Sequence, residues 1–267
     1  MGLIQKYGKT ALVVGASEGI GAAFAKSLAA EGMDLVLVAR REEPLNKLAG
    51  ELESRFNIKT TCIPCDLGAV DATEQITEAI DGTEIDMLVY NAALSYIGPF
   101  VNNSVEDNAR IAQINMITPL KMLHVFGEKM ISRGRGAVVI LASLAGFQGS
   151  GFLTVYAATK AFDRILAESL WYEWKDKGVD VIACCAGATS TPGYNNSNPG
   201  KTSLFAPRVQ APEEVAEECL KKLGSRPSFI SGKGNRIATF FMQKILPRKM
   251  AITIMGDTTR KMYGINC

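Results

Sequence analysis

Six short apolar runs alternate with longer segments of helical pattern along this chain of 267 residues. The runs show little polar alternation, which is typical of strands buried on both faces of a parallel sheet. Parallel neighbours need crossover connections, usually helices, and ligands then bind at the carboxyl ends of the strands. The pattern therefore predicts an α/β protein with a Rossmann-type doubly wound parallel sheet of about seven strands and helices on both faces. The expected strands lie at residues 10–16, 34–40, 59–67, 85–93, 136–143 and 179–187, and the expected helices at 19–32, 42–56, 69–81, 104–132 and 154–177.

No linker, repeat or low-complexity segment divides the chain, so we expect a single domain over residues 1–267. Residues 188–211 are rich in Pro, Gly, Asn and Ser and follow a strand directly, which favours a lid over a substrate rather than a plain surface excursion. The C-terminal segment, about 232–267, includes a strip at 236–255 that mixes apolar and basic residues. We expect this strip to cover a pocket or an oligomer interface in preference to a membrane surface.

Composition excludes several classes of function. A net charge of +2 with no concentrated basic face argues against nucleic-acid binding. No apolar run reaches the roughly 18 residues of a membrane-spanning helix, and the N-terminus lacks a signal-peptide pattern, so we expect a cytoplasmic protein. Cys62 and Cys65 form C-x-x-C, but no second pair completes a zinc site and His124 is the only histidine. We expect no metal.

A glycine-rich turn, VVGASEGIGAAFA, joins the first expected strand to the first expected helix. Glycines here permit a tight turn and close approach of the backbone to a pyrophosphate, which the helix N-terminus then attracts. The spacing is G-x-x-x-G-x-G without a following Gly-Lys-Ser/Thr, which argues against a nucleoside-triphosphatase loop. The turn therefore predicts a dinucleotide site that includes Gly15, Ser17, Gly19, Ile20 and Gly21.

The end of the second strand indicates which dinucleotide is bound. Arg40 and Arg41 stand about where an NAD-binding fold keeps an acid for the ribose hydroxyls. A guanidinium can instead bind a 2′-phosphate through charge-assisted hydrogen bonds. We therefore expect NADP(H), with Arg40 favoured as the ligand and Arg41 left open, because both could simply begin a solvated helix. Asp66, at the end of the third strand, is expected to accept from the adenine amine.

Together these motifs resemble the short-chain dehydrogenase/reductase family over residues 8–192. The matching residues are the glycine turn, Asn91-Ala92-Ala93, Asn115, Ser143 and the Y-x-x-x-K of Tyr156 and Lys160. Two departures are Ala93, where the family has Gly, and Ala186-Gly187, where it has Pro-Gly. The resemblance implies an NADP(H) site that also includes Leu67, Asn91, Ala92, Gly187, Thr189 and Thr191, together with Tyr156 and Lys160.

Tyr156 and Lys160 lie at i and i+4 of an expected helix, so they share one face. A free phenol ionises near pH 10, and a neighbouring ammonium stabilises the phenolate, which suits a general acid/base. Ser143 can hold a substrate oxygen against Tyr156. By resemblance, Asn115 holds a water that links Lys160 to solvent, and the Thr191 hydroxyl contacts the nicotinamide carboxamide. The alternatives are a surface lysine, a half-buried tyrosine and a turn serine.

The expected substrate is a bulky apolar ketone or secondary alcohol, because the candidate pocket residues Leu94, Tyr96, Phe147, Phe152, Tyr194 and Phe205 carry few charges. The chain looks most similar to bacterial hydroxysteroid dehydrogenases of the 7β bile-acid branch, and also resembles 17β-hydroxysteroid and 3-oxoacyl reductases. We therefore expect an NADP(H)-dependent hydroxysteroid or bile-acid dehydrogenase. The alternatives are a 3-oxoacyl thioester reductase and a non-catalytic NADP(H)-binding regulator. The family's helix pairing favours a homodimer or homotetramer.

Overall fold

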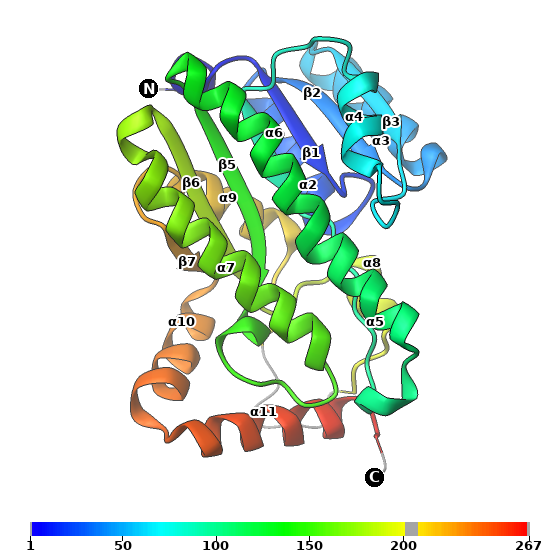
Figure 1. Cartoon of the computed structure of the whole chain (residues 1–267), viewed down its shortest axis with the longest axis vertical. Helices are drawn as coiled ribbons and strands as arrows, with labels where there is room; N and C mark the ends of the chain where they lie inside the picture. The colour runs from blue at the N-terminus through cyan, green and yellow to red at the C-terminus, as the bar shows by residue number, and fades with distance from the viewer. Residues whose placement is uncertain (1, 201–207, 266–267) are drawn as a thin grey trace.

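The computed structural model describes residues 2–200 and 208–265 of the chain. Seven parallel strands form one sheet in the order β3-β2-β1-β4-β5-β6-β7 (Figure 1). The order reverses between β1 and β4, which is the switch point where this class of sheet leaves a crevice for a ligand. The predicted doubly wound Rossmann-type sheet is therefore confirmed. The strands are β1 (Thr10–Val14), β2 (Asp34–Ala39), β3 (Thr60–Pro64), β4 (Met87–Tyr90), β5 (Gly136–Ser143), β6 (Val179–Ala186) and β7 (Ser228–Ile230).

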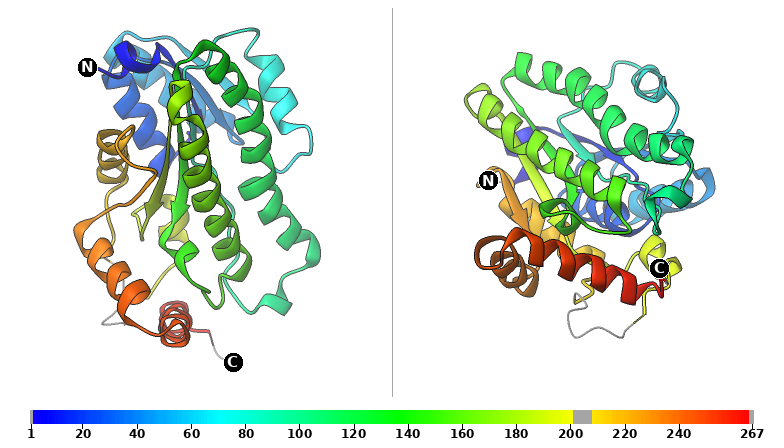
Figure 2. Two further views of the ribbon diagram at one scale, coloured as in Figure 1. Left: turned by 60° about the vertical axis from the view of Figure 1, so that its left-hand side comes forward. Right: turned by 60° about the horizontal axis from the view of Figure 1, so that its bottom comes forward.

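Helices cover both faces of the sheet, as Figure 2 shows from the side. One buried cluster lies between the sheet and α2, α3 and α9, and a second lies between the sheet and α4, α6 and α7. The described α-helices are α1 (Leu3–Tyr7), α2 (Gly19–Ala30), α3 (Glu42–Phe56), α4 (Ala72–Ala79), α5 (Val105–Ala112), α6 (Thr118–Arg133), α7 (Thr154–Trp174), α8 (Pro192–Asn196), α9 (Pro212–Lys222), α10 (Lys233–Phe240) and α11 (Arg248–Met262).

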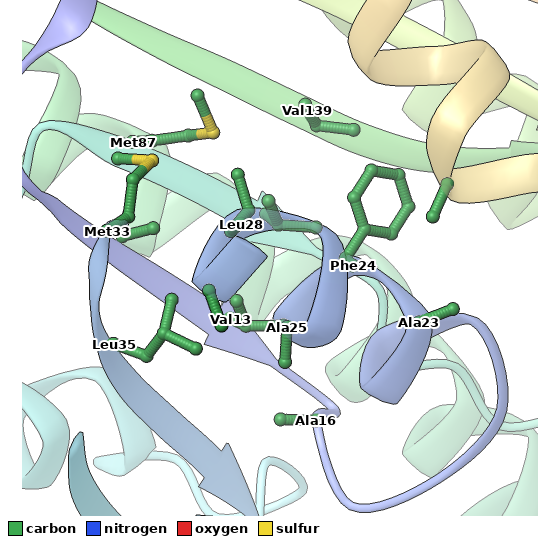
Figure 3. Packing of buried hydrophobic residues seen from close by; sticks show 14 of the residues in the cluster. Val13, Ala16, Ala23, Phe24, Ala25, Leu28, Met33, Leu35, Met87 and Val139 are labelled. Carbon is green, nitrogen blue, oxygen red and sulfur yellow. The ribbon is translucent and has the colours of Figure 1, made fainter. Parts of the chain in front are cut away.

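The helix that follows the glycine turn is fixed by its apolar side chains. Phe24 and Leu28 of α2 are fully buried, one turn apart, against the first face of the sheet (Figure 3). Val13 of β1 and Met87 of β4 belong to the same cluster. Full burial of each such side chain contributes about 1.5–3 kcal/mol, so α2 and the turn before it are held firmly against the switch point.

The third strand departs from the prediction. β3 is the edge of the sheet and pairs only with β2. Within it only Ile63 is buried, while Thr61 and Pro64 are exposed, so the strand is not buried on both faces. It also ends at Pro64 rather than beyond Asp66, and Cys62 is only half-buried. An edge strand has no neighbour to cover its outer side, which an apolar reading of residues 59–67 cannot foresee.

The long helix expected at 104–132 is present but interrupted. A π-helical turn at Gln113–Ile117 separates α5 from α6. Such a wide turn inside a helix is frequently found at functional sites, and here it contains Asn115. Similarly, the helix expected at 154–177 is α7 followed by a 3₁₀ turn at Lys175–Lys177.

The C-terminal segment forms two helices beyond the carboxyl ends of the strands (Figure 1). α10 continues into a π-helical turn at Phe241–Ile245, and Pro247 precedes α11, which crosses this end of the molecule. No helix in the described part of the chain is both long and apolar enough to cross a bilayer. The segment instead leaves large apolar side chains exposed, namely Ile237, Phe240, Phe241, Ile245, Met250 and Ile252.

Candidate active site

The glycine turn forms a cradle that other residues would fill. Gly15 and Gly19 have left-handed backbone conformations, with φ of 82° and 59°. A Cβ at Gly15 would lie 2.8 Å from the backbone of Ala92, and one at Gly19 would lie 2.8 Å from Cγ2 of Thr191. At Gly21 a Cβ would lie 1.9 Å from the Gly15 carbonyl oxygen. The turn thus keeps open the close backbone approach that a pyrophosphate requires.

Hydrogen bonds to two neighbouring strands hold this turn. Asn91, just past β4, donates from Nδ2 to the Gly15 carbonyl over 2.9 Å. The Gly15 amide donates to Val38 of β2 over 2.8 Å. The turn is therefore held in place by contacts within the protein, and the helix N-terminus that follows it is the kind of element that attracts an anion.

The two arginines after β2 have different surroundings. Arg41 forms an ion pair with Glu18 of the glycine turn, whereas Arg40 is exposed at the end of the strand. Arg40 is close enough to Asp66 to help lower the pKa of that carboxyl. Arg40 thus forms no ion pair with the glycine turn. This leaves its guanidinium available for the 2′-phosphate contact that we expect of it.

Asp66 has a partner that the sequence did not suggest. Arg110 of α5 donates from Nη2 to both carboxylate oxygens, over 2.8 and 2.7 Å. This hydrogen bond, followed by one from the Gly68 amide, lowers the pKa of Asp66 below its ordinary value. Any adenine contact of Asp66 would have to share the carboxylate with Arg110, so the adenine role of Asp66 stays a prediction.

The candidate catalytic residues converge on the carboxyl end of β5. Ser143 is the last residue of that strand, and its Oγ accepts from the Ala145 amide over 3.2 Å, which leaves the hydroxyl proton free to be donated. Lys160 of α7 donates from Nζ to the carbonyl of Leu141 on β5 over 2.6 Å. Tyr156, one turn earlier on α7, is half-buried on the same face as Lys160. The carboxyl end of β5 and this part of α7 are thus held together through Lys160.

Lys160 is buried together with a carboxylate. Its Nζ lies 2.8 Å from Oδ2 of Asp163, and the two residues are 2 % and 1 % exposed. Burial alone would lower the pKa of Lys160, but Asp163 and then Tyr156 more than offset it and hold that pKa above its ordinary value. Burial raises the pKa of Asp163, an effect that Lys160 partly offsets. We take the pair as ammonium and carboxylate at neutral pH.

Asn115 is fully buried and its side-chain amide is already engaged. Its Nδ2 donates to the Leu94 carbonyl over 2.9 Å and to Thr159 Oγ1 over 3.0 Å, while Oδ1 accepts from the Leu94 amide over 2.8 Å. The side chain therefore joins the loop after β4 to α7. Its role in a proton relay stays a prediction, for which the side chain retains one acceptor position on Oδ1.

The remaining expected cofactor residues already take part in hydrogen bonds within the protein. The carbonyl of Leu67 accepts from Thr118 over 2.9 Å, and the Thr189 hydroxyl donates to the Gly187 carbonyl over 3.1 Å. Thr191 accepts from the Tyr194 amide over 3.1 Å at the start of α8. Its methyl group lies close to Gly19, so the start of α8 approaches the glycine turn.

The expected pocket residues are only partly placed together. The ring of Phe147 packs over the Arg164 guanidinium, 4.6 Å from its centroid, and against the core, so it does not form a free wall. Tyr96 lines a small hollow of about 10 Å³ with Phe100 and Val155. Phe205 lies outside the described residues.

His124 is exposed on α6, and no cluster of three potential metal ligands occurs in the part of the chain that is described.

Sequence reasoning missed three residues of the site. Asp163 and Thr159 contact Lys160 and Asn115, and Arg110 contacts Asp66. Of these, only Asp163 could have been predicted from the sequence, because an acid three positions after a lysine on a helix is placed to form an ion pair with it. Arg110 and Thr159 depend on tertiary contacts that no local pattern reveals.

Comparison with known proteins agrees with this geometry. The sequence model of the short chain dehydrogenase family matches residues 9–202. A 7beta-hydroxysteroid dehydrogenase of Collinsella aerofaciens is 34% identical over 238 residues, covering 88% of this chain and 90% of the relative. A very-long-chain 3-oxoacyl-CoA reductase of Danio rerio is 28% identical, covering 97% of this chain and 84% of the relative.

Solved structures show the same likeness. A 7beta-hydroxysteroid dehydrogenase superposes with a TM-score of 0.90 at 32% identity and covers 96% of this chain and 99% of its own. A short-chain dehydrogenase from Sphingobium yanoikuyae in complex with NADPH gives a TM-score of 0.75 at 28% identity, covering 84% of this chain and 87% of its own.

Proposed function

The chain belongs to the short-chain dehydrogenase family, and we propose that it is an NADP(H)-dependent oxidoreductase that interconverts a secondary alcohol and a ketone on a bulky apolar substrate, a hydroxysteroid or bile acid. One observation carries the proposal above all others. Lys160 of α7 donates to the Leu141 carbonyl of β5, the strand that ends at Ser143, and Tyr156 lies one turn before Lys160 on the same helix, which supports a shared site for the three residues.

The residues present fit a dinucleotide with a 2′-phosphate. A Cβ at Gly15, Gly19 or Gly21 would collide with Ala92, Thr191 or the Gly15 carbonyl, so the tight turn that a dinucleotide fold uses can form only with glycine at these positions. Arg40, exposed beyond β2, would hold the 2′-phosphate, and Asp66 the adenine end. A structural neighbour in complex with NADPH supports the same choice of cofactor. When bound, NADP(H) supplies or accepts the hydride.

The protein's own residues handle the proton. Ser143 donates a hydrogen bond from its hydroxyl to the substrate oxygen and so orients that oxygen toward Tyr156. During reduction, Tyr156 gives its phenolic proton to that oxygen, and during oxidation it takes the proton back. The Lys160 ammonium stabilises the phenolate left after proton donation and is itself fixed by Leu141 and Asp163.

A steroid-like substrate is supported by the relatives and by the pocket surroundings. The hydroxysteroid dehydrogenase relative covers most of this chain, and its solved counterpart superposes over nearly all of it. The loop after Ser143 is met by α11, whose Ile252 lies near Gly149. The apolar side chain of Ile252 beside this loop suits a large substrate with few charges.

The test is turnover followed at 340 nm with NADPH or NADP⁺ over keto- and hydroxy-bile acids, other steroids and 3-oxoacyl thioesters. We expect NADP(H)-dependent turnover of a steroid that Tyr156→Phe abolishes. Silence on steroids with activity on thioesters would instead favour the alternative function, reduction of a 3-oxoacyl thioester. That alternative is supported by the 3-oxoacyl-CoA reductase relative, which covers 97% of this chain.

A homodimer or homotetramer completes the proposal. The exposed apolar residues Ile165 and Tyr172 on α7 and Leu120 on α6 support it, because such side chains gain by burial against a second subunit. Light scattering of the purified protein tests this point directly, and a monomer at micromolar concentration would contradict it.

A further inference from the structure

The catalytic lysine has a buried carboxylate partner with no part in the proposed proton transfer. Lys160 and Asp163 lie together in the interior at 2.8 Å, and Asp163 Oδ1 has no hydrogen-bond partner among the described residues. Burying both charges costs desolvation energy that their attraction seldom exceeds, so apolar residues in their place would often be at least as stable. Stability alone therefore does not explain why this buried ion pair is present.

We propose that Asp163 is a positioning residue that holds the Lys160 ammonium, in its charged form, on the Tyr156 face of α7. The functional importance of this role rests on the proposed function, because it matters to turnover only where Lys160 assists proton transfer. The clamp itself is a property of the chain alone.

The geometry of the clamp is specific. An ammonium has three N–H donors, and two of those of Lys160 point to the Leu141 carbonyl and to Asp163 Oδ2. One acceptor belongs to the buried strand β5 and the other to the next turn of α7, so neither can move far. The third donor is left for the cofactor side of the site.

The groups that face the pair from other elements do not replace the carboxylate. Burial raises the pKa of Tyr90 on β4 well above its ordinary value, and burial likewise raises the pKa of Cys185 on β6, so both are neutral at physiological pH. Tyr90 donates to the Ile114 carbonyl over 2.5 Å. Arg164, next to Asp163, is paired with Glu168 at 3.3 Å. Asp163 is thus the acid that compensates Lys160.

The first experiment titrates Lys160 in the cofactor-free protein by NMR of ¹³Cε-labelled lysine, with Lys160→Arg to assign the resonance. We expect the wild-type pKa to lie above the ordinary value of about 10.4, and Asp163→Asn to lower it by at least about one. Asp163→Glu keeps the charge and should restore much of the loss. Glu168→Gln removes a charge from the same helix farther from the site and should leave the resonance unchanged.

The second experiment compares pH profiles of kcat for ketone reduction. In Asp163→Asn the alkaline limb should move to lower pH, while the ketone KM stays within about two-fold, because the substrate contacts are intact. An identical Lys160 titration in wild type and Asp163→Asn, or a wild-type Lys160 that is neutral at pH 7, would overturn the clamp. A shifted titration in a wild-type protein that turns over no substrate on the panel would instead leave the clamp standing and overturn the proposed function.

Discussion

The two sides of the candidate site are built in opposite ways. The catalytic side, β5 with α7, is part of the sheet core, where Lys160 and Asp163 are nearly inaccessible. The C-terminal side, α10 with α11, leaves Phe240, Phe241 and Ile245 more than half exposed. One side is fixed by packing on the sheet, and the other is fixed by a few contacts with loops.

α10 is tied to β7 and α9 through Arg236, which donates to the Ile230 carbonyl and pairs with Glu218, whereas the contacts of α11 and the turn before it reach the loop after Ser143 and the segment after α8. Arg248 donates to the Phe147 carbonyl over 2.8 Å, and Gln243 donates to Gln148 over 2.6 Å. At its other end, α11 accepts from Gly200 through the Met262 carbonyl over 2.7 Å. We call the sheet side the rigid wall and the C-terminal side the separable wall. Under the proposed function, the rigid wall would carry the chemistry and the separable wall would shape the pocket.

The strongest test of the rigid wall is Tyr156→Phe. Loss of the phenolic proton should lower kcat/KM by about 10²–10⁴-fold, because general acid/base catalysis contributes that much. The side chain is half-buried and makes no structural hydrogen bond through its hydroxyl among the described residues, so the melting temperature should stay within a few degrees. Steady-state kinetics and thermal unfolding measure both, and near-normal turnover would contradict the assignment.

A second test asks whether the rigid wall depends on its buried ion pair. Lys160→Met leaves the Asp163 carboxylate buried without a counter-charge, which should lower the free energy of unfolding by about 3–5 kcal/mol. The double variant Lys160→Met with Asp163→Leu should regain most of that loss while staying inactive. Urea unfolding of the three proteins is the measurement, and equal stability of single and double variants would argue against a coupled pair.

Cofactor preference tests a different part of the sheet, the carboxyl end of β2. Arg40→Asp should weaken NADPH binding by roughly 10–100-fold relative to NADH, because a charge-assisted contact is replaced by repulsion. Arg41→Ala, which removes the partner of Glu18, should have a smaller effect and is the matched control. Fluorescence titrations with both cofactors decide, and a reversed order of the two variants would assign the 2′-phosphate to Arg41.

Substitutions in the separable wall should change the kinetics less than those in the rigid wall. Arg248→Met removes the hydrogen bond to the Phe147 carbonyl and should raise KM for a bulky substrate several-fold, about 1 kcal/mol, with kcat for a small ketone unchanged. Lys249→Met, a neighbouring exposed cation that has no such bond among the described contacts, serves as the control. A large loss of kcat with the small ketone would show that the two sides are not independent.

The smallest effect concerns pH and the exposed pair of Asp66 with Arg110. Because the folded-state pKa of Asp66 is lowered, its stabilisation is present above the ordinary carboxyl range near pH 4 and is lost as the pH falls through the folded value. Arg110→Met should therefore cost about 0.5 kcal/mol at pH 7, and the difference from wild type should vanish near pH 2. Urea unfolding at both pH values checks the sign.

Much of the rigid wall could be predicted from the sequence. Continuous apolar runs and glycine spacing are local patterns, and they led to the sheet, the cradle and the Tyr156–Lys160 face. The partners of these residues could not be predicted so well, because Thr159 on Asn115 and Arg110 on Asp66 depend on how α5 and α7 approach the strands. The exposed edge of β3 likewise depends on strand order.

The structure of the C-terminal side is the part that the sequence predicts least well. Apolar and basic residues are mixed at 236–255, and that mixture is the same whether a segment covers a pocket, a partner or a membrane. The structure shows where α11 lies, although Phe147, expected in the pocket wall, packs toward Arg164 instead. Helices held by loop contacts leave weak local signals, because their orientation is decided by a handful of tertiary bonds.

The position of α11 also has an evolutionary consequence. This helix touches the loop after Ser143 near one end and the segment after α8 near the other, and it adds little to the sheet core. We therefore expect exposed positions of α11 to tolerate mutation better than the buried positions of α7. Under the proposed function, a lineage could diversify its substrates by exchanging this C-terminal helix, and an engineer could do the same by grafting the helix from a relative onto an unchanged catalytic scaffold.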